Sequence, residues 1–142
     1  MSRTGSYGQS FVMKLLSQDK LDEALDEAER AVTQDPEDPE VVFDRAQVHL
    51  ALEHWEAGVA DVERALELDR TARILDDSEL DDALFSALVA WGRQVAESDR
   101  PRALTILERY LGLFPKGGHH KDYEEWKRRL GGEQRTSWTR TR

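Results

Sequence analysis

The sequence predicts an all-α protein, a right-handed solenoid of three antiparallel helix pairs followed by a C-terminal capping helix. The first observation behind this prediction is a period of 34 residues, since AERAVTQDPED at residues 28–38 aligns with VERALELDRTA at 62–72. A third copy, RPRALTILERYLGLFP, occupies residues 100–115. Apolar residues also recur at helical spacing, and no segment shows the pattern of a strand. Repeats of this length are helix pairs that bury their apolar faces by stacking.

The first four helices are expected where apolar stripes lie between turn signals. An apolar stripe predicts a first helix at about 7–16, and LDEALDEAERAVTQ at 21–34 forms the second, with acids in its first turn where the helix dipole favours them. Pro36 and Pro39 separate it from a third helix at 39–52, because proline suits a first helical position. The fourth, at about 56–69, can extend through residue 74 or 75, because Arg70 replaces the proline of the first copy.

The period slips after Asp69, which predicts an insertion of about 11 residues relative to the 34-residue repeat. The extra residues either lengthen both flanking helices or form a small lobe. Ser78 followed by Asp81 resembles a capping box and predicts a helix running to about Glu97. The third pair then ends at Pro115, and KDYEEWKRRL at 121–130 is an amphipathic helix suited to cover the exposed end.

The predicted organisation therefore has seven parts. They are a flexible N-terminus at 1–6, repeats at about 5–38, 39–72 and 84–117 that together span 7–117, an insertion at about 73–83, a capping helix at 119–130 and a disordered basic tail at 131–142.

Charge and composition narrow the class of function. The chain of 142 residues carries a formal charge of −9 and no cysteine. Residues 1–115 hold 25 acidic and 12 basic side chains, whereas residues 116–142 hold four and eight. An acidic body disfavours nucleic acid and anionic membranes as partners. Since the sequence shows neither a signal-peptide core nor a bilayer-spanning apolar stretch, a cytoplasmic protein is expected.

No residue pattern predicts chemistry. No Gly-rich loop follows a strand and no histidine sits in a nucleophile–base arrangement, so neither an enzyme nor a cofactor is expected. His119 and His120 beside Asp122 lack a third ligand at a familiar spacing, and a flexible linker explains them better than a metal site. The acidic run at 76–82 lacks the central glycine and closing glutamate of a calcium loop.

The repeats resemble those of the tetratricopeptide repeat (TPR) family, in particular small bacterial proteins of this kind. The matching residues are Phe11, Val12, Leu21, Ala24, Ala31 and Pro36 in the first copy, Val42, Ala46, Trp55, Gly58 and Ala65 in the second, and Leu88, Trp91, Gly92, Ala103, Tyr110 and Pro115 in the third. The departures are Gly8, His49 and Tyr110. The resemblance covers about residues 5–117 and implies a protein that binds partners in a groove lined by the first helix of each pair.

By register, the groove positions are Gln9, Ser10, Met13 and Leu16, then Glu40, Phe43, Asp44, Gln47 and Leu50, then Val89, Ala90, Arg93 and Ala96. The predicted partner-binding residues among them are Met13, Glu40, Phe43, Asp44, Gln47, Leu50, Val89 and Arg93. Relatives that bind acidic chaperone tails use a Lys, Asn and Arg clamp, but only Arg93 could serve here, and Glu40 and Asp44 would repel such a tail. A peptide or helix with apolar anchors and some basic residues fits better.

The function predicted is therefore a protein–protein interaction adaptor or scaffold. The alternative is a small secretion-type chaperone that holds an apolar client segment, and a homo-oligomeric structural module ranks below both. Tyr7, Phe11 and Leu15 of the first helix form a candidate homodimer contact, because no helix precedes them. The Arg-rich tail around Trp138 is either a disordered solubilising end or a motif that docks a partner or masks the groove.

Overall fold

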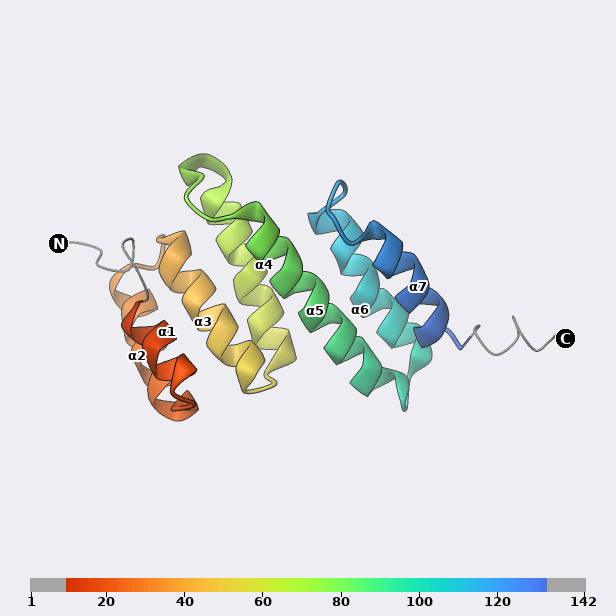
Figure 1. Cartoon of the computed structure of the whole chain (residues 1–142), viewed down its shortest axis with the longest axis horizontal. Helices are drawn as coiled ribbons and strands as arrows, with labels where there is room; N and C mark the ends of the chain where they lie inside the picture. The colour runs from red at the N-terminus through yellow and green to blue at the C-terminus, as the bar shows by residue number, and fades with distance from the viewer. Residues whose placement is uncertain (1–9, 133–142) are drawn as a thin grey trace, which may run out of the picture. The chain divides into compact units, whose positions relative to one another are not determined.

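The structure is a computed structural model that describes residues 10–132, with only the backbone at residues 71 and 72. All regular structure in this part of the chain is helical, in the order α1 to α7 (Figure 1). The predicted all-α fold class is confirmed for these residues. The chain forms two compact units, unit 1 at residues 1–76 and unit 2 at 77–142. Within the described residues, no helix combines the length and apolar composition needed to cross a membrane.

Unit 1 contains α1 (Phe11–Ser17), α2 (Leu21–Gln34), α3 (Pro39–Ala51) and α4 (Trp55–Ala72). The predicted start of α3 is confirmed: Pro39 begins the helix, and the Asp38 carboxylate accepts a hydrogen bond from the Glu40 N–H at 2.9 Å. The Ser10 hydroxyl likewise accepts from the Met13 N–H at 3.1 Å and caps α1. Each cap satisfies a backbone donor that has no partner inside its own helix.

The end of α4 is decided by a side chain. Arg73 adopts the left-handed conformation, with φ of 53°. The buried Asp69 carboxylate then accepts hydrogen bonds from the Ile74 N–H at 2.7 Å and the Leu75 N–H at 3.1 Å. The helix therefore continues past Asp69 and ends at Ala72. It does not extend through residue 74 or 75, although Arg70 in place of a proline would permit that extension.

Small residues one period apart are buried where the helices of unit 1 meet. Ala24 and Ala28 on α2 have no exposed surface, and their counterparts on α4, Gly58 and Val62, are also buried. A side-chain carbon placed on Gly58 would collide with the Leu50 Cδ2 of α3. The two helices approach closely because this position carries no side chain.

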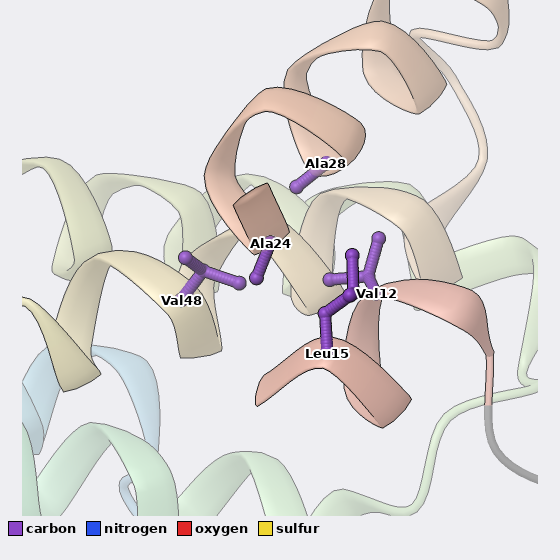
Figure 2. Packing of buried hydrophobic residues seen from close by; sticks show 5 residues of the cluster. All are labelled: Val12, Leu15, Ala24, Ala28 and Val48. Carbon is purple, nitrogen blue, oxygen red and sulfur yellow. The ribbon is translucent and has the colours of Figure 1, made fainter. Parts of the chain in front are cut away.

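Figure 2 shows how α1, α2 and α3 share one apolar core. Val12 and Leu15 of α1 point toward Ala24 and Ala28 of α2, and Val48 of α3 lies beside Ala24. Each helix alone has too short an apolar face to be stable in water, so burial of this shared cluster stabilises all three.

Unit 2 contains α5 (Asp77–Ala96), α6 (Arg100–Leu113) and α7 (His120–Leu130). α5 packs along α6, and α7 packs against both. α4 has 18 residues and α5 has 20, against 14 in α2 and 13 in α3. Most of the extra residues predicted at about 73–83 therefore lengthen the two flanking helices, and only four residues connect them.

Substitution of Gly58 tests the close approach of α3 and α4. We expect Gly58→Leu to lower the free energy of unfolding by about 1–3 kcal/mol, because the Leu50 side chain and the helix axes must move apart. Gly112→Leu is the matched control: nothing lies within 4 Å of a side-chain carbon placed there. It should raise stability by up to about 1 kcal/mol through helix propensity. Urea unfolding followed by far-ultraviolet circular dichroism measures both, and equal effects at the two glycines would contradict this packing.

Candidate partner-binding site

Residues one period apart on α1 and α3 form the best-defined part of the predicted groove. The Ser10 hydroxyl donates a hydrogen bond to the Asp44 Oδ2 at 2.8 Å, and these residues are 34 positions apart. The next positions along the two helices are Met13 with Gln47 and Leu16 with Leu50. We call these six half-buried residues the α1–α3 face: Ser10, Met13, Leu16, Asp44, Gln47 and Leu50.

The α1–α3 face combines apolar surface with negative charge. Met13 and Leu16 are partly exposed on α1, and Asp44 is partly exposed on α3, where the partly exposed Glu40 lies one turn before it and borders the face. The hydrogen bond from Ser10 holds the Asp44 carboxylate at the contact between the two helices. The carboxylate therefore keeps one position on the face. A fixed carboxylate beside apolar side chains suits a partner that offers both an apolar anchor and a basic group.

Phe43 and Leu50 are placed differently from the surface anchors that the sequence predicts. Phe43 is only 5% exposed, so its ring belongs to the interior of unit 1 and offers little area to a partner. Leu50 directs its Cδ2 and Cγ toward Gly58 of α4. Met13 and Leu16 are therefore the better candidates for apolar contact on this face.

The last two predicted site residues lie in unit 2. Val89 is 9% exposed and is part of the core, whereas Arg93 is exposed near the end of α5. The Arg93 guanidinium stacks over the ring of Trp126 on α7, with its central carbon 5.5 Å from the ring centroid. The predicted amphipathic side of α7 is confirmed by burial of Tyr123 and Leu130, but its sequence gives no indication that Trp126 contacts an arginine.

Unit 1 is strongly acidic. Residues 1–76 hold 18 acidic and eight basic side chains, whereas residues 77–142 hold 11 and 12. One of the few basic groups of unit 1, the Arg45 guanidinium, is neutralised by a two-point ion pair with the Asp61 carboxylate, at 2.8 and 3.0 Å. The potential at the surface of unit 1 is therefore dominated by carboxylates.

A cluster of polar residues joins the three helices of unit 2. The Asp81 carboxylate of α5 is 7% exposed and accepts a hydrogen bond from the Gly118 N–H at 2.8 Å. Tyr110 of α6 is hydrogen-bonded to Asp81, and its hydroxyl accepts a bond from the His119 N–H at 2.9 Å. Burial and then the bond to Asp81 raise the pKa of Tyr110 to about 12. Tyr110, which departs from the small residue of the family pattern, thus anchors the connection before α7.

His119 is held in place, in contrast to the flexible linker predicted from the sequence. Its ring stacks on that of Phe85 with centroids 4.7 Å apart and an interplanar angle of 6°. Its Nε2 lies 2.6 Å from the Asp82 Oδ1, and its Nδ1 lies 3.5 Å from the Asp122 Oδ2. Within residues 10–132 no group of three or more histidine, aspartate or glutamate side chains has the arrangement of a metal site.

Comparisons with known proteins do not assign this chain to a family: no family model matches it, and neither does any curated protein.

Replacement of Phe43 tests whether this residue is core or partner anchor. We expect Phe43→Ala to lower the free energy of unfolding by about 3–5 kcal/mol, because it leaves a cavity in unit 1. Gln47→Ala, one turn along the same helix, should change it by less than about 0.5 kcal/mol. Urea unfolding compares the two variants. A small change in the free energy of unfolding for Phe43→Ala would instead indicate that Phe43 is a surface residue.

The His119–Asp82 contact predicts a pH-dependent stability. The hydrogen bond to Asp82 raises the pKa of His119 above its ordinary value of 6.5, despite partial burial. Because the folded state binds this proton more tightly, the stabilisation is complete below the ordinary pKa and is lost as pH rises through the raised pKa. The difference in unfolding free energy between wild type and His119→Gln should therefore shrink from about pH 5 to about pH 9. A difference that is constant or grows over this range would contradict a protonated His119.

Proposed function

We propose that this protein is an adaptor of the TPR type, in which the α1–α3 face binds a segment of a partner protein. The observation that carries the proposal is the Ser10–Asp44 hydrogen bond, because it joins equivalent positions of successive repeats on one face. Stacked repeats that align equivalent residues in this way present extended binding surfaces.

The stacking that we propose is a right-handed solenoid of three antiparallel helix pairs, α1–α2, α3–α4 and α5–α6, with α7 as the capping helix. Short connections between packed helices, at residues 18–20, 52–54 and 97–99, support this pairing. The close contacts at Gly58 and Gly92 support it further, since both glycines occupy the small position expected of a helix pair. We propose a cytoplasmic location, because a chain without cysteine needs no oxidising compartment.

The partner segment is proposed to carry basic residues and one or two apolar anchors, as an extended peptide or a helix. The carboxylates of Asp44 and Glu40 and the excess of acidic side chains in unit 1 attract the basic residues. Met13 and Leu16 provide the apolar contact area. Such a segment would associate rapidly at low salt and lose affinity as salt screens the charges.

A role as a secretion-type chaperone is the second candidate, and the exposure of Phe11 supports it. Phe11 at the start of α1 is 59% exposed, which is unusual for a large aromatic side chain and suits an apolar client. A chaperone would be required for its client to stay soluble, whereas an adaptor would link partners that are soluble without it. Co-expression of a captured partner with and without this chain separates the two.

The adaptor proposal is tested by capture of partners with the full chain, identification by mass spectrometry, and titration of the identified segment. The double variant Glu40→Gln with Asp44→Asn removes two charges but keeps hydrogen-bonding side chains at both positions. We expect it to weaken binding by between about twofold and about tenfold at low salt, as two partly exposed ion pairs would.

Glu37→Gln with Glu56→Gln is the matched control, because it removes two exposed charges of unit 1 that lie outside α1 and α3. It should leave the affinity within about twofold of wild type. An equal loss in both double variants would mean that net charge alone attracts the partner. No loss in either would argue against this face as the binding site.

A further inference from the structure

Two arginines stack on one tryptophan in unit 2. The central carbon of the Arg93 guanidinium lies 5.5 Å from the Trp126 ring centroid, and that of Arg129 lies 5.0 Å from it. Arg93 comes from α5, and the other two residues come from α7. We call these three residues the basic–aromatic patch.

The basic–aromatic patch can still bind carboxylates. A guanidinium that stacks on a ring uses its flat face, so its N–H donors at the edge remain available for a carboxylate. Arg129 donates one bond to Glu125 at 3.1 Å, whereas Arg93 makes no ion pair within residues 10–132. Lys127 and Arg128 are exposed on the same turn of α7 and add to the positive charge.

A complementary surface exists on α2 of unit 1. Asp22, Asp26 and Glu29 follow one another at helical spacings of four and three, and all three are exposed. Asp22 and Asp26 make no ion pair with another residue of the described chain, whereas Glu29 interacts electrostatically with Arg45 and His49 of α3. We call them the acidic stripe.

The acidic stripe is unfavourable for the isolated helix. Like charges four or three residues apart on a helix repel one another and destabilise it. The helix dipole offsets this cost only for Asp22, which lies in the first turn, and not for Asp26 or Glu29. A basic surface placed against the stripe would remove the repulsion.

We propose that the basic–aromatic patch of one copy binds the acidic stripe of a second copy, so that the protein self-associates head to tail. The arginines neutralise the carboxylates, and the half-buried Trp126 supplies apolar contact next to them. Each copy carries one patch and one stripe, so the contact can form reciprocally within a dimer or link copies in series. This contact is separate from the α1–α3 face and does not depend on the proposed adaptor function.

Charge favours the acidic stripe over nucleic acid or an anionic membrane as the ligand of the patch. The patch belongs to a chain whose net charge is −9, so a long polyanion would meet repulsion from most of the molecule. A second copy carries the same net charge, so repulsion between copies also opposes this contact, but the stripe presents three carboxylates on one helix rather than a continuous line of phosphates. The association should be weak, because a few partly exposed ion pairs each contribute little.

Sedimentation equilibrium of the full chain tests the proposal. At about 0.05 M salt the mean mass of wild type should rise with concentration between about 10 µM and about 1 mM, and at about 0.5 M salt it should stay near that of the monomer. Arg93→Gln with Arg129→Gln should weaken the association by about tenfold. The control Arg102→Gln with Lys116→Gln neutralises two other exposed residues of unit 2 and should leave it unchanged.

A mixing experiment shows whether the contact lies between copies. Arg93→Glu with Arg129→Glu gives a chain with two acidic surfaces, and Asp26→Lys with Glu29→Lys gives a chain with two basic ones. Each should remain monomeric alone, while an equimolar mixture should associate, because the intact stripe of the first meets the intact patch of the second. Circular dichroism of both variants checks that they are folded.

Three results would overturn the proposal. Wild type could remain monomeric over the whole range at low salt, which would also be the result if the patch were occupied within one chain. Association could persist undiminished in Arg93→Gln with Arg129→Gln, which would place the contact elsewhere, for example at Phe11. Folded variants could also fail to associate when mixed.

Discussion

Small residues at the points where helices meet are the constraint on which both units depend. Ala24 and Ala28 leave no gap between α2 and its neighbours, and Gly58 admits the Leu50 side chain of α3. In unit 2, a side-chain carbon on Gly92 would lie 3.0 Å from the Leu130 Cδ1 of α7. Helices of seven to 20 residues are marginal in isolation, so their stability comes from this close packing. Close packing buries one side of each helix and leaves the other side exposed. The surfaces proposed to bind partners lie on these exposed sides.

Polar side chains set the ends and connections of these packed helices. Asp69 terminates α4, and Asp81 with Tyr110 holds the connection between α6 and α7. Ser10 and Asp44 tie α1 to α3 at the edge of the α1–α3 face. Buried or half-buried carboxylates are stable in these places because backbone or hydroxyl donors satisfy them. Many other acidic side chains of unit 1 are exposed, and the partner chemistry that we propose rests on their charge.

Prediction from the sequence succeeded where the signal was local. Pro39 predicts the start of α3, because a proline suits the first helical position through its own backbone. Prediction was less complete where distant residues decide the outcome. The sequence placed Phe43 in the groove by register, but its burial depends on which side of α3 meets the rest of unit 1. His119 was read as part of a linker because its contacts with Phe85 and Asp82 join residues more than 30 positions away.

The sequence by itself determined the helical class, the 34-residue period and the approximate limits of the helices. These follow from the spacing of apolar residues and from capping residues, which act over one or two turns. Only the tertiary structure decided that Ser10 meets Asp44, that Phe43 is core and that two arginines share Trp126. Side-chain partners between helices depend on how each helix is rotated and spaced against its neighbours. Periodicity in a sequence constrains that arrangement but does not specify it.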